Sequence, residues 1–315
     1  MKRRIIFWGT SSFAVPILER LLRMPAIEVA AVVTRADAPT GRHQEVESTP
    51  IKKMAEKNNL RILTPVKHGS PDFLSELKNL APETAVVAAY GRIIPKAALD
   101  LPLRGTLNLH PSLLPVYRGP SPIQAAILNG DKKTGVTLML LDEEMDHGPV
   151  LAQCEVELDG TEIYSELEQK LSIIAAEFLS ENLLNYLDGK IEPREQDDAR
   201  AVYCAMIERA SGRIDWRKSA VEIERMSRAY EKWPGVWAVW AGSDSRKLRL
   251  KFSDVSVEPE CNLKPGEITV QSDALVIGAA QGAIRVRKIQ AEGKKEMMIK
   301  EFLNGFSRFA NGRFE

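Results

Sequence analysis

The chain has 315 residues, 44% of them hydrophobic, with 43 basic and 43 acidic side chains and three cysteines. This length predicts about two domains of roughly 100–200 residues each, and the lack of any apolar run near the roughly 20 residues that a bilayer span needs predicts a cytoplasmic protein without a membrane anchor. The cysteines are too few and too far apart for a disulfide framework or a Cys-x-x-Cys metal site, and the balanced charge argues at first sight against a nucleic-acid partner.

The first 189 residues alternate short apolar runs with helical patterns, which is typical of a parallel sheet with crossover helices. One amphipathic helix follows the first strand, and a second is predicted over residues 161–187, before Gly189, which suits a left-handed cap. We therefore predict a doubly wound, Rossmann-like α/β domain over residues 1–189. Its predicted strands are residues 4–8, 29–34, 84–89, 106–110, 135–141 and 150–158.

The character of the chain changes after this domain. Residues 190–206 contain a run, 192–198, that is too polar to pack, and we predict a linker there. Several short alternating segments separated by turn residues then predict a small β-barrel over residues 207–315. Its predicted elements are a helix at 220–230 and strands at 237–240, 247–252, 266–270, 274–277 and 283–289.

The turn after the first strand does not carry the dinucleotide-binding fingerprint. Gly9 is followed by Ser11 and Ala14 where the second and third glycines of Gly-x-Gly-x-x-Gly would stand. The second strand ends in Thr34-Arg35, without the acidic residue that would bind a ribose hydroxyl. A nicotinamide enzyme is therefore not expected.

Polar side chains follow two of the predicted strands. Asn108 and His110 are two residues apart on one strand, so both side chains emerge on one face, and Pro111 ends the strand. The segment from Asp142 to Asp146 follows the next strand, and we expect it to reach the same sheet edge. An amide, an imidazole and a carboxylate together suit formyl or acyl transfer to an amine, by general acid/base catalysis with a hydrogen bond to the tetrahedral oxyanion.

Two other chemistries could use the same residues. A Ser112–His110–Asp146 hydrolase triad is less favoured, because Ser112 does not lie on a Gly-x-Ser-x-Gly elbow. A metal site made from His110, His147 and Asp146 is also less favoured, because the sequence lacks histidines at i, i+3 or i, i+4 spacing. Each residue alone could have an ordinary structural role, but the three together favour transfer chemistry.

These residues resemble the core of the folate-dependent formyltransferases. The most specific part is Asn108-x-His110, followed by Ser112-Leu-Leu-Pro115 and Arg118-Gly119, with Asp146-x-Gly148 further along. The resemblance covers nearly the whole chain, and the second domain narrows it to members of the superfamily that act on charged tRNA. The other matching segments are Ile5-Ile-Phe-x-Gly9-Thr, Gly41-Arg42, Ala88-Ala-Tyr-Gly-Arg-Ile-Ile-Pro95, Gly212-Arg-Ile-Asp-Trp216, Trp233-Pro-Gly235 and Gly293-Lys-Lys295.

The resemblance implies formyl transfer from 10-formyltetrahydrofolate, as a co-substrate, to the α-amino group of methionine on initiator methionyl-tRNA, as in translation initiation. It implies a monomer with no metal, no permanently bound cofactor and an oligonucleotide-binding (OB) type second domain. His110 would be the general acid/base, Asn108 the oxyanion donor and Asp146 the partner of His110. The folate site would comprise Tyr90, Gly91, Arg92, Ile93, Ile94, Ser112, Leu113, Leu114, Pro115, Leu141 and Asp142, and tRNA would contact Arg42, Arg213, Lys294 and Lys295.

Charge refines this expectation. Residues 1–200 carry 23 basic and 28 acidic groups, whereas residues 201–315 carry 20 and 15, so the balanced total conceals a basic second domain suited to tRNA. The family's basic run after Gly41-Arg42 is replaced here by a segment with Glu45 and Glu47, which weakens the expected phosphate contact of that loop. The same chemistry on a sugar-nucleotide amine or on water, and a non-catalytic tRNA-binding protein, remain the alternatives.

Overall fold

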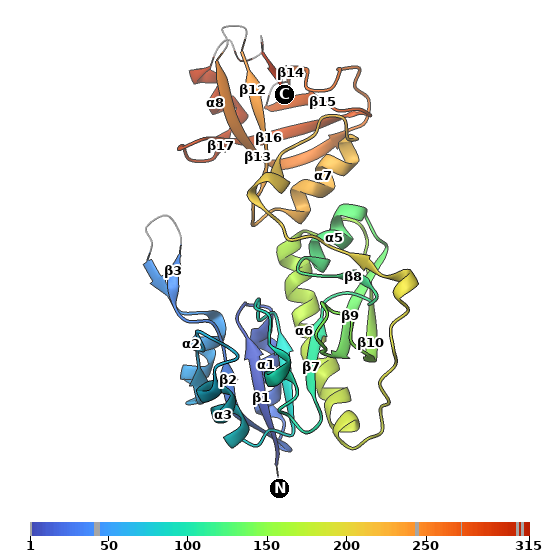
Figure 1. The fold of residues 1–315 in the computed structure, drawn as a ribbon. Coiled ribbons are helices and arrows are strands. Elements are labelled where there is room, and N and C mark those ends of the chain that lie inside the picture. Colours follow the sequence, from blue (N-terminus) through green and yellow to red (C-terminus); the bar gives the residue numbers. More distant parts are fainter. Residues whose placement is uncertain (1, 41–44, 243–245, 272, 307–308, 310–311) are drawn as a thin grey trace. The chain divides into compact units, whose positions relative to one another are not determined.

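The structure is a computed structural model that describes residues 2–40, 45–242, 246–271, 273–306, 309 and 312–315. The chain folds into two compact units (Figure 1). The first comprises Met1–Pro122, Lys133–Glu157 and Leu167–Ala205, and the second comprises Ile123–Lys132, Leu158–Glu166 and Met206–Glu315. The main boundary thus falls at the end of the segment that we predicted as a linker.

A seven-stranded sheet forms the centre of the first unit, in the order β10-β9-β7-β6-β1-β2-β5. The strands from β5 to β7 in this order are parallel, whereas β9 is antiparallel to both of its neighbours. The predicted Rossmann-like α/β class is confirmed, with an antiparallel strand inserted near one edge. The strands are β1 (Arg3–Gly9), β2 (Ile27–Val33), β5 (Ile62–Leu63), β6 (Thr84–Ala88), β7 (Thr106–His110), β9 (Lys133–Leu140) and β10 (Val150–Glu157).

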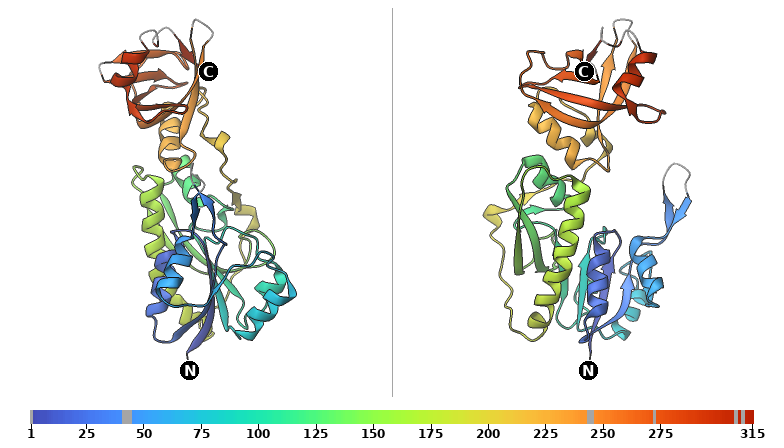
Figure 2. Two further views of the ribbon diagram at one scale, coloured as in Figure 1. Left: turned by 90° about the vertical axis from the view of Figure 1, so that its left-hand side faces the viewer. Right: turned by 180° about the vertical axis from the view of Figure 1, so that it is seen from behind.

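Helices lie on both faces of this sheet (Figure 2). The α1 helix buries Ile17, Leu18 and Leu21 completely, because these residues share one helical face. Gly189, with φ of +73°, follows the end of α6, as the sequence predicted. The helices of this unit are α1 (Ala14–Arg23), α2 (Pro50–Lys57), α3 (Pro71–Asn79), α4 (Lys96–Leu99) and most of α6 (Tyr164–Leu187), whereas α5 (Pro122–Asn129) belongs almost entirely to the second unit.

Two small strand pairs accompany the main sheet. The strands β3 (Ala38–Thr40) and β4 (Glu45–Glu47) form an antiparallel pair. The strand β8 (Val116–Arg118) pairs in parallel with β11 (Val202–Tyr203). Since β11 belongs to the segment 190–206, this polar segment packs onto the first unit through its backbone.

The second unit is an antiparallel sheet in the order β14-β15-β16-β13-β12-β18, with β17 (Met297–Met298) paired to β16. Phe314 N donates to Gly266 O at 2.9 Å, just before β14, so the two edges of the sheet approach each other. This curled half-barrel confirms the predicted OB-type class. The remaining elements of this unit are β12 (Val236–Ala241), β13 (Lys247–Glu258), β14 (Ile268–Gln271), β15 (Ala274–Gly278), β16 (Ala283–Ala291), β18 (Arg313–Phe314), α7 (Ala220–Ala229), α8 (Ile299–Gly305) and the 3-10 turn η2 (Arg209–Gly212). A further 3-10 turn, η1 (Asp198–Arg200), lies in the first unit.

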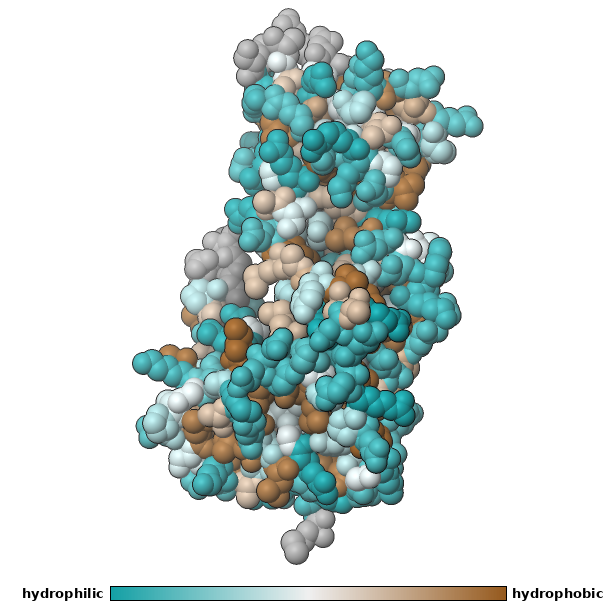
Figure 3. All heavy atoms as spheres, turned by 45° about the vertical axis from the view of Figure 1, so that its right-hand side comes forward, coloured by the Kyte–Doolittle hydropathy of each residue, from teal (hydrophilic) through white to brown (hydrophobic). Residues whose placement is uncertain are grey.

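The surface shown in Figure 3 is mainly hydrophilic, with apolar residues in several separate small patches. Among the described residues, no helix combines the length and the apolar character that crossing a membrane requires.

Candidate active site

The site begins at the carboxyl end of β7. Asn108 lies between Val87 of β6 and Met139 of β9, and His110 lies opposite Thr137 of β9. Pro111 follows directly and the strand ends there. The His110 side chain is buried, with 5% of its surface exposed. Asn108 and His110 therefore share one face of a strand that is fixed on both sides, as the sequence predicted.

His110 and Asp146 come together although they lie 36 positions apart in the chain. His110 Nε2 lies 2.9 Å from Tyr117 O, and because a carbonyl oxygen only accepts, this nitrogen donates. His110 Nδ1 faces Asp146 Oδ1 at 3.6 Å, which is longer than a hydrogen bond. The other carboxylate oxygen, Asp146 Oδ2, accepts from Gly119 N at 2.8 Å. The carboxylate thus has a fixed position beside Nδ1, a ring nitrogen that accepts or donates no hydrogen bond within the described part of the chain.

The loop that carries Asp146 reaches this position by a route that the sequence did not predict. Because β9 runs opposite to β7, its last residue, Leu140, lies opposite Leu107, and Leu141 N donates to Thr106 O at 2.8 Å. The loop 141–149 therefore starts beside the amino end of β7, not at its carboxyl edge, and Asp146 reaches His110 only because the loop folds back. Asp146 adopts φ of +51° within it.

The turn 112–115, predicted as a folate contact, is anchored to β9 and β10. Ser112 Oγ donates to Val116 O at 2.6 Å, so its hydroxyl is not directed at His110 and the hydrolase triad is not formed. Thr137 Oγ1 donates to Ser112 O at 2.6 Å and accepts from Leu114 N at 3.1 Å. Gln153 Nε2 donates to Leu114 O at 2.8 Å. Leu113 is half-buried, Leu114 is buried and Pro115 is half-buried, in a turn whose backbone position is fixed.

The segment 90–94, also predicted as a folate contact, divides into a buried anchor and an exposed turn. The Tyr90 side chain is buried, and its hydroxyl lies 2.5 Å from His68 Nε2. Burial raises the pKa of Tyr90 to about 12 and lowers the pKa of His68, so the Tyr90 hydroxyl donates a hydrogen bond to a neutral imidazole. Gly91, with φ of +74°, Arg92 and Ile93 are exposed. Ile94 is half-buried and packs, with Leu141, against the apolar core beneath β1 and β6.

Asp142, the last predicted folate residue, is bound to His147. Asp142 Oδ2 lies 2.6 Å from His147 Nδ1, and this hydrogen bond raises the pKa of His147. His147 Nε2 faces Asp198 Oδ2 at 3.7 Å. His147 is therefore directed at two carboxylates, and within the described parts of the chain no group of three or more His, Cys, Asp or Glu residues is arranged to hold a metal ion.

Sequence reasoning missed a set of residues that border this site. Arg118 is 1% exposed, and its Nε donates to Gln196 Oε1 at 3.0 Å. Its Nη2 pairs with Asp198 Oδ1 at 2.7 Å, and this ion pair lowers the pKa of Asp198. Gln196 Nε2 in turn donates to Asp146 O at 2.9 Å and Gly148 O at 2.8 Å. Arg118 belongs to a recognisable motif, but Gln196 and Asp198 lie in a polar run whose role depends on contacts distant in sequence.

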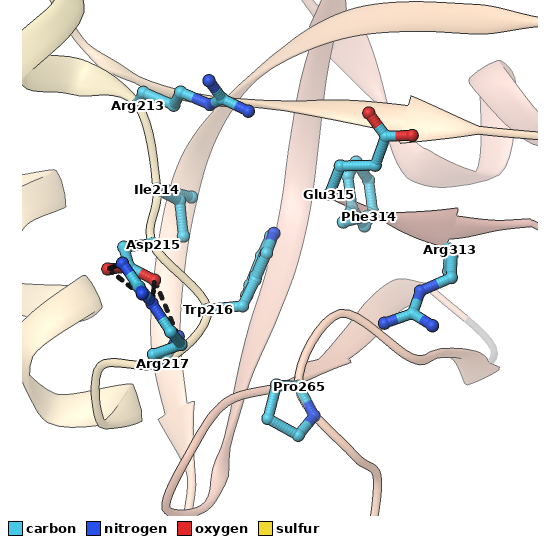
Figure 4. A pocket seen from close by; sticks show the side chains of 9 residues that line it. All are labelled: Arg213, Ile214, Asp215, Trp216, Arg217, Pro265, Arg313, Phe314 and Glu315. Atoms are coloured by element: carbon cyan, nitrogen blue, oxygen red, sulfur yellow. Dashed lines mark hydrogen bonds and ion pairs between the residues drawn. The ribbon is translucent and has the colours of Figure 1, made fainter.

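The predicted tRNA contacts of the second unit are exposed. Lys294 and Lys295 lie in the turn between β16 and β17, after Gly293 with φ of +73°. Arg213 lines a groove of about 570 Å³ together with Arg217 and Arg313 (Figure 4). Arg217 is bound to Asp215, which lowers the pKa of that carboxyl to about 2. Arg42 lies outside the described residues.

Two family models match the chain in sequence order. Residues 2–183 match formyl transferase, and residues 206–307 match formyl transferase, C-terminal domain. A methionyl-tRNA formyltransferase of Roseiflexus sp. (strain RS-1) is 40% identical over 305 residues, which cover 97% of this chain and 93% of that protein. A methionyl-tRNA formyltransferase of Chloroflexus aurantiacus is 41% identical over 304 residues, which cover 96% of each protein.

Solved structures share the fold at lower identity. The N-formyltransferase from Helicobacter canadensis, in complex with folinic acid and dTDP-3-aminofucose, matches with a TM-score of 0.65 and 18% identity over 92% of this chain and 100% of that chain. HypX from Aquifex aeolicus, in complex with tetrahydrofolic acid, matches with a TM-score of 0.61 and 20% identity over 97% of this chain. The match covers 48% of HypX, so this chain spans about half of its length.

Proposed function

The chain belongs to the methionyl-tRNA formyltransferase family, and we propose that it transfers the formyl group of 10-formyltetrahydrofolate to the α-amino group of methionine on initiator methionyl-tRNA. The observation that carries the proposal is the position of Asp146, whose Oδ1 lies 3.6 Å from His110 Nδ1. His110 itself lies two residues beyond Asn108 on the same strand. The Tyr117 carbonyl occupies the other ring nitrogen, which leaves Nδ1 for the reacting amine.

The residues support direct transfer without a covalent enzyme intermediate. The amine nitrogen attacks the formyl carbon, and His110 accepts the proton that the amine loses. The Asn108 side-chain amide donates to the oxyanion of the tetrahedral intermediate, and the Asp146 carboxylate stabilises the imidazolium. The bond from the formyl carbon to folate N10 then breaks, and His110 returns the proton to N10. The products are a formamide and tetrahydrofolate, so protons and electrons balance.

We place the folate between the turn 112–115, the segment 90–94 and the start of the loop 141–149. The turn 112–115 is held by Thr137 and Gln153, so its backbone groups keep fixed directions for a polar ligand. Exposed Ile93, with 85% of its surface free, offers apolar area for a flat aromatic ring. Folate is a co-substrate in this proposal, and the protein holds no resident cofactor.

We assign acceptor binding in part to the basic second unit. Its exposed Lys294, Lys295 and Arg213 suit phosphate contacts, which supply most of the sequence-independent affinity for nucleic acid. Arg42 and the acidic segment after it would add a weaker contact than in other family members. The proposed enzyme is a monomer.

An acceptor panel tests the proposal. Transfer of labelled formyl from 10-formyltetrahydrofolate is measured to initiator methionyl-tRNA, elongator methionyl-tRNA, a sugar-nucleotide amine and water. We expect initiator methionyl-tRNA to be the preferred acceptor. Preference for the sugar amine or for water would assign the chemistry to another substrate, and no binding of a 10-formylfolate analogue would favour a non-catalytic tRNA-binding protein.

A further inference from the structure

The segment that leads out of the first unit contacts the loop that carries Asp146. One side chain makes two polar contacts there and one with β8: Gln196 Nε2 donates to Asp146 O at 2.9 Å and to Gly148 O at 2.8 Å, and Gln196 Oε1 accepts from Arg118 Nε at 3.0 Å. We propose that Gln196 is a positioning residue for the transfer reaction and holds the Asp146 carboxylate against His110 and Gly119. This inference rests on the proposed function of His110 and Asp146.

Asp146 needs such a contact because its own backbone does not favour the observed conformation. Its φ of +51° lies in the left-handed region, which aspartate adopts more readily than most residues but less readily than glycine, and it belongs to no helix or strand. Its neighbour Met145 is 57% exposed and supplies little packing. The hydrogen bonds from Gln196 fix the carbonyl groups of Asp146 and Gly148, so they determine where the Asp146 side chain leaves the loop.

The orientation of the Gln196 amide is determined by its neighbours. Arg118 can only donate, so the amide oxygen must face Arg118 Nε and the NH₂ group must face the two carbonyls, which can only accept. Arg118 is itself fixed, because it is buried and paired with Asp198. Both amide protons and the amide oxygen are thus used. A carboxylate at this position could still accept from Arg118, but it would lack both donors.

The proposed role of Gln196 is more than attachment of the segment 190–206 to the first unit. The backbone of that segment is held independently, since Arg194 and Val150 exchange two backbone hydrogen bonds and β11 pairs with β8. Loss of the Gln196 side chain therefore leaves the segment attached. What changes is the freedom of the Asp146 loop, and this change affects the reaction only through Asp146.

A double-mutant cycle on the full-length protein tests the inference. Gln196→Met removes the three polar contacts at nearly constant volume, and Gln196→Glu keeps the contact with Arg118 but removes both donors. Each is made in the wild-type and Asp146→Asn backgrounds. Glu195→Gln, at the exposed neighbouring position, is the matched control. The readouts are kcat, KM for methionyl-tRNA and for 10-formyltetrahydrofolate, circular dichroism and the thermal midpoint.

In the wild-type background, we expect both Gln196 variants to lower kcat about 10- to 100-fold and to leave each KM within about threefold of the wild-type value. In the Asp146→Asn background, we expect them to lower kcat less than about threefold, because the carboxylate that Gln196 positions is already lost. An equal factor in both backgrounds, or a kcat within twofold of wild type in either folded Gln196 variant, would overturn the inference. If Gln196→Met does not fold, Gln196→Glu decides alone. If wild type and Glu195→Gln also fail to formylate methionyl-tRNA, the proposed function fails and the inference fails with it.

Discussion

The Asp146→Asn substitution gives the sharpest quantitative prediction for the reaction. It removes a negative charge 3.6 Å from His110 Nδ1, at a point where 5% of the His110 side chain and 15% of the Asp146 side chain are exposed. At an effective dielectric constant of about 20, which suits partly buried pairs, a carboxylate at this distance stabilises an imidazolium by about 4–5 kcal/mol. In the proposed mechanism the imidazolium forms during transfer, so this stabilisation would lower the barrier rather than the binding free energy.

The corresponding upper limit is a loss of about 10³-fold in kcat. The asparagine oxygen can still accept from Gly119 N and its dipole compensates part of the lost charge, so we expect a fall of about 10²–10³-fold with little change in either KM. The assay is transfer of labelled formyl to saturating initiator methionyl-tRNA in a single turnover, so that product release does not limit the rate.

The matched control is Glu144→Gln, which removes an exposed carboxylate from the same loop. Its backbone N–H still donates to Asp142, so the loop retains that hydrogen bond. We expect kcat within about twofold of wild type. If Asp146→Asn retains kcat within threefold of wild type, or if Glu144→Gln loses as much activity, the electrostatic role of Asp146 is wrong.

Three further predictions concern stability and binding. The hydrogen bond that His147 donates to Asp142 raises the pKa of His147, so its stabilising contribution is fully present below the unfolded pKa of about 6.5 and is lost as the pH rises through the raised folded value. His147→Gln should therefore lower the thermal midpoint at pH 6 but not at pH 9, and an equal loss at both would contradict this. Gly119→Ala should lower the free energy of unfolding in denaturant by about 1–3 kcal/mol, because φ of Gly119 is +122° and a Cβ there would lie 2.4 Å from the Cys204 carbonyl oxygen. An unchanged unfolding midpoint would refute the clash. Replacing both Lys294 and Lys295 by alanine should reduce the slope of log affinity for tRNA against log salt by about 1.5–2, and an unchanged slope would remove these lysines from the interface.

The strand that carries Asn108 and His110 was predictable because its signals are local. The strand 106–110 is bounded by Gly105 and by Pro111, and period-two alternation places Asn108 and His110 on one face. The apolar runs of the other central strands were equally clear, and their predicted bounds agree with the structure to within a few residues.

The direction of β9 was not predictable in the same way. A strand of buried residues has the same hydrophobic pattern whether it pairs parallel or antiparallel, so the sequence did not reveal that the loop 141–149 begins at the amino end of β7. The contacts of Gln196 were also hidden. They join positions about 50 residues apart, and the polar run around Gln196 has the composition of a solvated linker.

The backbone around His110 makes different demands on durability and on catalysis. Tyr117, whose carbonyl binds His110, has φ of +63°, and Asp146 has φ of +51°. The strain at Tyr117 is tied to a buried side chain whose packing a smaller residue would lose, whereas asparagine tolerates the conformation of Asp146 as well as aspartate does and can still accept from Gly119 N. Selection of random variants for survival at high temperature alone should therefore retain Tyr117 but tolerate Asp146→Asn, whereas selection that also demands formylated product should retain both residues.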